Sequence, residues 1–353
     1  MSRISNSHNV SIVTAASTAI GTLAQSMSAG TWAELTGVSN IFNGIANTGK
    51  ASGHYLSYGN AAVWNPANKT INIVGGDHDG SDTNWLHHCI YTEATNTWAN
   101  PVWPIFASSY GHAYDHLCVR PDNGDLYWRH FNDDTYEVAR KTLAGSWTEM
   151  TGEIATNLYV NSPGCGVAWW TGSLTGIGAS GCLLIANESE SGEIVYYDPL
   201  NSTWGRISNA GGPGNPDYHG LIEYSATKNC AIFGGSNQAG TVVRRLNSDK
   251  TTTVLTPFTP RWGINRGNCV ADPVTGNFLI RTSGTAGFYE YNPSGSGSYR
   301  QLTGSSAAPA SLGITAQDPS NLMSCAIPEY GVVVYITAGS SVGACHMHLY
   351  KHA

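Results

Sequence analysis

The sequence predicts an all-β fold, a β-propeller of four-stranded blades, with six blades as the simplest count and seven as the alternative. The composition combines 41 Gly, 18 Tyr and 11 Trp with only 12% charged residues, which is typical of many short strands joined by tight turns. A strand-rich unit recurs along the chain. No window shows long helical periodicity, and residues 9–27, the nearest case, are too rich in Ser, Thr and β-branched residues, so we expect no helix there.

The recurring unit is an apolar strand, a Gly-rich or polar loop, an aromatic strand and a closing large side chain. Its clearest copy runs from Ile71 to Trp98, contains Gly75 and Gly76, and looks like a kelch unit. Further copies end at Trp147, Trp204, Leu255 and Tyr299. Their spacing of about 45 to 65 residues suits four-stranded propeller blades.

The two ends of the chain complete the blade count. Residues 322–351 supply three strands with no closing segment, and residues 30–35 supply a closing strand with nothing before it. Pairing them closes the ring and removes two open sheet edges. A seventh blade would need hidden strands in residues 36–60 or 303–321. We therefore divide the chain into an N-terminal arm or linker (1–29) and a single propeller domain (30–353).

Charge and hydropathy exclude some partners. The net charge is −7 without any basic block, which argues against a nucleic-acid partner held by phosphate contacts. No segment approaches 18 consecutive apolar residues, so we expect no membrane span. The stretch after Arg3 is too polar for a convincing signal peptide. An extracellular or virion-associated location is favoured.

The eight cysteines are expected to be free thiols. Cys118, Cys165, Cys269 and Cys325 fall at similar places on the proposed inner strands. Cys182 and Cys230 fall on the next strands out. This pattern is typical of small buried side chains that fill a tapered core rather than of a disulfide framework.

Chemically active side chains concentrate on one face of the predicted ring. If the strands of each blade are labelled a to d from the axis outward, the d–a and b–c connections open on the same face. The d–a connections carry His54, Tyr58, His112, His116, Tyr159, Asn161, Tyr218, His219, Arg261, Trp262 and Arg266. The b–c connections carry Asp77, Asp79, Arg129, His130, Asp133, Asp134, Glu188 and Glu190. A polar, aromatic rim of this kind indicates a ligand site.

The densest part of this rim is residues 110–134, which form one predicted hairpin. His112 precedes its first strand and His130 ends its second strand, so both imidazoles could face a shared ligand. Tyr159 and Tyr218 stand at matching starts of later blades. Arg261 and Arg266 share one d–a connection and could bind a carboxylate.

His112, His130, Tyr159 and Tyr218, placed on a propeller rim, resemble the site of the β-propeller ulvan lyases. The resemblance implies a polysaccharide lyase, a carbon–oxygen lyase that cleaves a uronic-acid-containing polysaccharide by β-elimination, with these four residues as catalytic groups. The other d–a residues and Arg129 would bind substrate. Two features depart from that family: it is described as seven-bladed, and Glu188 and Glu190 stand where it places an Arg.

The residue types suit this chemistry. The site must neutralise the uronate carboxylate, for which Arg, His or Asn serve, and must supply a base and an acid, for which His or Tyr serve. No cofactor is required, and the partner is an anionic polysaccharide or another glycan. The sequence leaves the oligomeric state open.

Two other functions remain as alternatives. Pairs among the rim carboxylates could serve a glycoside hydrolase. A non-catalytic glycan-binding propeller, such as a viral adhesin, would need the same aromatic rim. A sialidase is disfavoured because no SxDxGxTW motif occurs.

Metal-ligand patterns are weak. The segment DHDGSD (77–82) alternates oxygen ligands but lacks the terminal Glu of a calcium loop. Cys345, His346 and His348, with His87 and His88 on an equivalent strand, could hold zinc, but the spacing is not diagnostic. We therefore assign no metal site from sequence.

Overall fold

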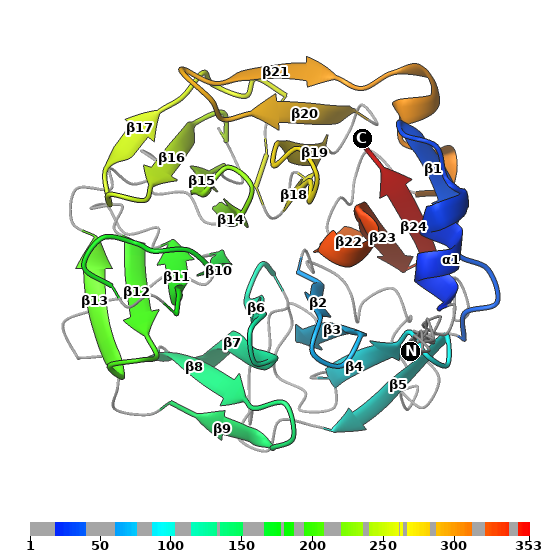
Figure 1. Cartoon of the computed structure of the whole chain (residues 1–353). Helices are drawn as coiled ribbons and strands as arrows, with labels where there is room; N and C mark the ends of the chain where they lie inside the picture. The colour runs from blue at the N-terminus through cyan, green and yellow to red at the C-terminus, as the bar shows by residue number, and fades with distance from the viewer. Residues whose placement is uncertain are drawn as a thin grey trace, which may run out of the picture.

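The computed structural model describes residues 18–39, 61–75, 87–102, 114–132, 135–150, 166–177, 180–186, 194–207, 220–235, 240–260, 262–263, 267–282, 287–312, 322–338 and 345–353. Within these residues, six four-stranded antiparallel sheets stand around a common axis (Figure 1). The prediction of a six-bladed propeller is confirmed. None of the helices in the described ranges has the length and apolarity to cross a membrane.

The blades follow the chain from the axis outward. Blade 1 consists of β2 (Val63–Asn65), β3 (Thr70–Gly75), β4 (His87–Thr92) and β5 (Thr97–Val102). Blade 2 consists of β6 (Leu117–Arg120), β7 (Asp125–Asn132), β8 (Thr135–Lys141) and β9 (Trp147–Glu149). Blade 3 consists of β10 (Val167–Trp170), β11 (Cys182–Ala186), β12 (Ile194–Asp198) and β13 (Thr203–Ile207).

Blades 4 and 5 repeat the arrangement, and blade 6 takes its outer strand from the start of the chain. Blade 4 consists of β14 (Leu221–Ser225), β15 (Cys230–Gly234), β16 (Val243–Asn247) and β17 (Thr252–Val254). Blade 5 consists of β18 (Gly267–Ala271), β19 (Phe278–Thr282), β20 (Phe288–Asn292) and β21 (Ser298–Gln301). Blade 6 consists of β22 (Leu322–Ile327), β23 (Val332–Ala338), β24 (Cys345–Lys351) and β1 (Thr31–Glu34). The short 3₁₀ turns are η3 (Gly304–Ser306), η4 (Ala310–Leu312) and η6 (Pro328–Tyr330).

The ring closes as the sequence predicts. β1 pairs antiparallel with β24 over four residues, from Thr31 opposite Lys351 to Glu34 opposite His348. Backbone hydrogen bonds extend the pairing at both ends, from Gly30 N to Lys351 O and from Leu35 N to Met347 O. The two ends of the chain therefore share one sheet.

Burial follows strand position within each blade. β11, β15 and β19 are buried along their whole length, because both of their faces pack against neighbouring blades. The outer strands are more exposed, as in β21. The predicted closing side chains lie on or beside these outer strands, and Trp98 and Trp147 are 5% and 7% exposed, so they seal the edges of the blades.

One prediction about the N-terminal region is wrong, because α1 (Ala19–Ser26) is a helix. Thr18 caps it by accepting a hydrogen bond from Gly21 N, and Ile20 and Ala24 are buried against blades 1 and 6. Lys351 Nζ donates to the carbonyls of Ala24 and Met27 at the other end. Docking therefore supplies the stability that propensity does not. The division into an arm and one propeller domain remains a prediction.

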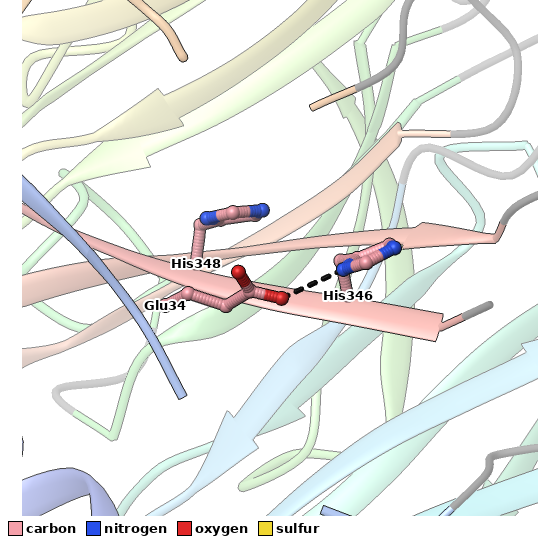
Figure 2. Close-up of side chains that lie close together, drawn as sticks. All are labelled: Glu34, His346 and His348. Atoms are coloured by element: carbon pink, nitrogen blue, oxygen red, sulfur yellow. Dashed lines mark hydrogen bonds and ion pairs between the residues drawn. The ribbon is translucent and has the colours of Figure 1, made fainter. Parts of the chain in front are cut away.

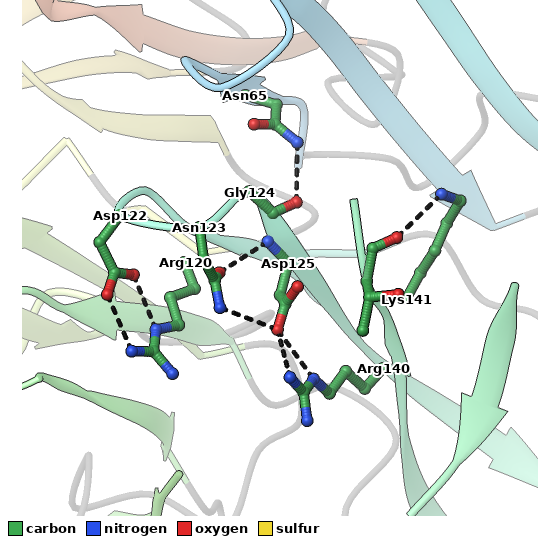
Figure 3. Close-up of polar contacts among 9 residues, drawn as sticks. Asn65, Arg120, Asp122, Asn123, Gly124, Asp125, Arg140 and Lys141 are labelled. Carbon is green, nitrogen blue, oxygen red and sulfur yellow. Dashed lines mark hydrogen bonds and ion pairs between the residues drawn. The ribbon is translucent and has the colours of Figure 1, made fainter. Parts of the chain in front are cut away.

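Side-chain hydrogen bonds lock the first turn of blade 2 (Figure 3). Asn65 Nδ2 of blade 1 donates to Gly124 O over 2.8 Å, and Arg140 Nε donates to Asp125 over 2.9 Å. Gly124 has φ +77°, and a Cβ there would lie 2.9 Å from Asn65 Oδ1. Glycine is therefore required where the two blades approach each other.

Six cysteines lie among the described residues, and all six are free thiols: Cys89, Cys118, Cys182, Cys230, Cys269 and Cys325. Cys118, Cys269 and Cys325 stand on inner strands, and Cys182 and Cys230 on second strands, as predicted. The side chains of Cys165 and Cys345 lie outside the described residues.

Candidate functional site

The two faces of the propeller differ in what they carry. We call the face at which the inner strands begin the mouth face, and the opposite face, which holds their first turns, the turn face. Inner strands of neighbouring blades are joined at the mouth face by backbone hydrogen bonds, from Ala61 N to Tyr114 O, from Val167 N to Asp115 O and from Gly166 N to Gly220 O. The predicted site residues belong to the mouth face.

Four of the predicted site residues lie among the described residues, namely His116, Arg129, His130 and Trp262. The others lie outside them: His54, Tyr58, His112, Tyr159, Asn161, Tyr218, His219, Arg261 and Arg266. The roles predicted for this second group therefore stay predictions.

His116 and Arg129 form a buried pair on the side of blade 2 that faces blade 3. Since Leu117 lies opposite Trp128, the next pair outward places His116 opposite Arg129. Arg129 Nη1 lies 3.2 Å from His116 Nε2, and each residue is 1% exposed. A guanidinium has no acceptor atom, so His116 accepts through Nε2. The pair is therefore buried on the blade 3 side of blade 2, near the mouth face, and does not face solvent.

His130 lies on the other side of blade 2, toward blade 1. Strand alternation puts it on the same side as Trp128, whose ring stacks on the imidazole with centroids 5.1 Å apart. His130 Nε2 lies 3.4 Å from Glu149 Oε1, and the residue is 2% exposed. The structure thus separates His130 from His116 and Arg129, and places it between two blades.

The Trp262 side chain lies in the core of the ring. Its indole is 0% exposed, packs in the cluster of blades 4 and 5 with Phe258 and Phe278, and donates from Nε1 to Val242 O over 3.1 Å. A fully buried indole has no free face for a sugar. The position therefore fits packing better than the predicted substrate contact.

A cavity of about 490 Å³ runs along the axis. The six inner strands line it with mainly small and apolar side chains, and Pro66, Pro121 and Pro328 from the first turns line its turn-face end. Two carboxylic acids, Asp115 and Glu223, also line it. The cavity has the size of a small-molecule site.

The Asp115 carboxyl group lines the channel and reaches past the inner edge of blade 3 to blade 4. It accepts a hydrogen bond from the backbone N–H of Ile222 in blade 4, two blades away. Between them lies Gly166 of blade 3, where a Cβ would be 2.6 Å from Asp115 Oδ2 and from Ile222 N. Burial, reinforced by the charge of Glu223, raises the pKa of Asp115 well above its ordinary value.

Glu223 lies midway along β14 and also bonds to a neighbouring blade. Its Oε1 accepts from Ala271 N over 3.0 Å. Burial raises the pKa of Glu223 to about 7, and this hydrogen bond opposes the shift only in part. The channel therefore holds two carboxyl groups whose pKa values are raised by burial, that of Glu223 to about 7, a property associated with functional sites.

Tyr114 is buried beside Asp115 at the start of blade 2. It has φ +21°, which is uncommon for a residue other than glycine, and it is 1% exposed. It belongs to the apolar cluster of blades 4 and 5 with Leu221 and Trp262. Tyr114 and Asp115 therefore both link blade 2 to blades further round the ring.

Sequence reasoning missed Asp115 and Glu223. The signal was an acid within an apolar inner strand, as in LIEYS around Glu223, since isolated acids are rare at buried positions. The sequence alone could not show that both acids share the axial channel.

Comparison with known proteins supports the fold. No protein-family model and no curated protein matches the chain. Among solved structures, virginiamycin B lyase from Staphylococcus aureus superposes with a TM-score of 0.54 at 11% identity over 90% of this chain and 98% of that one. An AofleA mutant from Arthrobotrys oligospora gives 0.55 at 8% identity over 86% of each chain.

A third structure, an auxiliary nutrient binding protein from Bacteroides thetaiotaomicron, gives a TM-score of 0.51 at 12% identity over 84% of this chain and 70% of that one. At such low identities the similarity shows a shared fold and carries no activity with it. The comparisons therefore support the fold, and the six four-stranded sheets of the structure show that this chain is a six-bladed β-propeller.

Proposed function

We propose that this protein is a polysaccharide lyase that cleaves a uronic-acid-containing polymer by β-elimination at the mouth face. One observation carries the proposal. The six antiparallel blades direct every d–a and b–c connection to one face, and six of the chain's twelve histidines lie in or beside those connections, together with Tyr159, Tyr218, Arg261 and Arg266.

A rim built from the connections of several blades suits a polymer, because a long chain can contact more than one blade at once. Another propeller of this fold is a lyase, so the architecture is compatible with this reaction class.

The steps of the reaction are assigned to residues of different blades. A base removes the proton next to the carboxylate, an acid protonates the leaving oxygen, and a cation neutralises the carboxylate. We assign the proton transfers to His112 with Tyr159 or Tyr218, and the carboxylate to Arg261 or Arg266. His130 is buried against Trp128 and Glu149, which favours a positioning role over the predicted direct one.

Glycan binding without catalysis is the second candidate. It is favoured by the burial of His116 and His130, which leaves fewer rim groups free for proton transfer. Hydrolysis by the acids of the b–c connections is the third reading, and it would need two carboxylates at a fixed separation.

The test is incubation with ulvan, alginate, pectin and glycosaminoglycans, followed by the ultraviolet absorbance of the unsaturated uronate product. With an active substrate, His112→Ala and Tyr218→Phe are each expected to lower kcat by roughly 10²-fold, as for loss of a proton-transfer group. Tyr330→Phe is the matched control, because Tyr330 lies on the turn face and bonds to Glu93; its kcat should be unchanged.

Other results would redirect the proposal. Reducing ends without the chromophore would identify a hydrolase. Calorimetric binding of a glycan with no product would identify a binding propeller. Full activity in both rim variants would remove His112 and Tyr218 from the mechanism.

A further inference from the structure

The pairing that closes the ring brings three metal-binding side chains together. In the β1–β24 ladder, Glu34 lies directly opposite His348. His346 and His348 are two residues apart on β24, so their side chains project from the same face of the sheet. Glu34 thus joins two histidines that are more than 300 residues away in the sequence.

The three side chains converge on one point (Figure 2). His346 Nδ1 lies 2.7 Å from Glu34 Oε1, and the two imidazole rings stand nearly parallel, with centroids 6.1 Å apart and planes at 21°. One candidate ligand atom from each residue lies within 4.8 Å of the others. A shared cation is therefore within reach of all three.

The cluster combines one buried histidine with two partly exposed side chains. His348 is 3% exposed, and its buried Nε2 has no hydrogen-bond partner among the described residues. A buried polar atom left unsatisfied is costly. The side chains of Glu34 and His346 are 43% and 41% exposed, so solvent and ions reach the cluster from outside.

We propose that Glu34, His346 and His348 bind a divalent transition metal, with Zn²⁺ as the first candidate and water in the fourth position. Two histidines and a carboxylate are an established ligand set for zinc. With metal–ligand bonds of about 2.0–2.1 Å, ligand atoms in a tetrahedral site stand about 3.3 Å apart. The His346 Nδ1–Glu34 Oε1 spacing of 2.7 Å lies below that value, and the other spacings do not exceed 4.8 Å, so small side-chain rotations suffice to reach it.

The expected role is to fasten the ring closure. β1 and β24 come from opposite ends of the chain, and their four-residue ladder is what closes the propeller. A metal held by both strands adds a link that exists only in the folded ring, so its binding free energy stabilises that state. This role is independent of any activity at the mouth face.

His88, which lies on an equivalent strand of blade 1, does not fit a metal ligand. Its Nε2 bonds to Asn72 Oδ1 over 3.0 Å, and its Nδ1 accepts from Trp147 Nε1 over 3.4 Å. Both ring nitrogens are thus occupied, and the structure supplies Glu34 as the third ligand instead.

The experiment follows thermal unfolding of the chelator-treated full chain with and without Zn²⁺. At about 100 times the Kd, Zn²⁺ should raise the Tm by roughly 3–6 °C. Glu34→Gln and His346→Gln, both at exposed positions, should abolish this rise and weaken binding by at least roughly 100-fold. Mg²⁺ should have no effect, since it prefers oxygen ligands.

His352→Gln is the matched control. His352 also pairs with a glutamate, through Nε2 and Glu290 Oε1 at 2.9 Å, but belongs to no three-ligand cluster among the described residues. This variant should keep the full zinc-induced rise, even if its own Tm is lower.

Cobalt gives an independent readout of the ligands. Co²⁺ bound to the wild-type chain should show visible d–d absorption without a thiolate charge-transfer band. A missing Tm rise in the wild type, an equal rise in Glu34→Gln and His346→Gln, or a thiolate band would each overturn the proposal. The first result would leave an ordinary Glu34–His346 ion pair.

Discussion

The outer part of blade 5 and the central channel each bury a glutamate, and the pKa values of the two carboxyl groups are shifted in opposite directions. Glu290 on β20 is 8% exposed. It accepts hydrogen bonds from His352 Nε2 at 2.9 Å, Asn277 Nδ2 at 2.6 Å and Arg300 Nε at 2.6 Å. The bond from His352, followed by those from Asn277 and Arg300, lowers its pKa to about 2.

Glu223 in the channel has one backbone N–H, that of Ala271, to oppose its burial. Its pKa rises to about 7. Burial is thus common to both residues, and the partners decide which form is favoured. The outer site is a hydrogen-bonded network that keeps Glu290 ionised, whereas Glu223 in the channel can exchange a proton near neutral pH.

The largest predicted effect is a loss of stability at the inner strands around Asp115. Gly166→Ala would place a Cβ 2.6 Å from Asp115 Oδ2 and from the Ile222 nitrogen, in a place where neither atom can move without disturbing the inner strands. We expect a loss of about 3 kcal/mol in the free energy of unfolding, measured by urea denaturation.

Gly295→Ala is the control for this substitution. Gly295 has φ +61° with nothing within 4 Å of an added Cβ, so it should cost only about 1 kcal/mol from backbone strain. Equal losses in the free energy of unfolding for both variants would show that the contact between Asp115 and Ile222 does not restrict position 166.

The second prediction breaks the outer network. Glu290→Gln removes the carboxylate charge, and we expect a loss of about 2 kcal/mol at pH 7. Since the folded pKa is about 2 and the ordinary value is 4.5, the contribution of Glu290 is present above pH 4.5 and is lost as the pH falls toward 2. The variant should lack that part of the acid transition.

Arg300→Met is the matched control for the outer network. The Arg300 side chain is 69% exposed, and an exposed partner contributes about 0.5 kcal/mol. If this variant costs as much as Glu290→Gln, the central role given to Glu290 is wrong.

The smallest prediction has the opposite sign. Glu223→Gln keeps an acceptor for Ala271 N and removes the unfavourable charge. Because the folded pKa of about 7 lies above the ordinary 4.5, the wild-type free energy of unfolding should fall as the pH rises from 4.5 to 7. The variant should flatten this slope and be about 1 kcal/mol more stable than the wild type at pH 8. A less stable variant at pH 8 would contradict the raised pKa.

Much of the fold follows from local pattern. The recurring apolar strand, aromatic strand and closing Trp98, Trp147 or Trp204 predict the blades, and the incomplete units at the two ends predict their pairing. The helix α1 does not follow, because its Ser/Thr-rich residues have weak propensity and it is held by contacts with Tyr330 and Lys351. Those contacts exist only after the ring has closed.

The candidate site divides in the same way. The sequence by itself determined at which face each connection emerges, because antiparallel strand order fixes it, and on this basis it predicts that His, Tyr and Arg gather on one face. Only the tertiary structure decided that Arg129 faces blade 3 and His130 faces blade 1, that Asp115 and Glu223 share the axial channel, and that Glu34 joins His346 and His348. Each of these depends on a pairing or a packing between distant strands, which local sequence pattern does not encode.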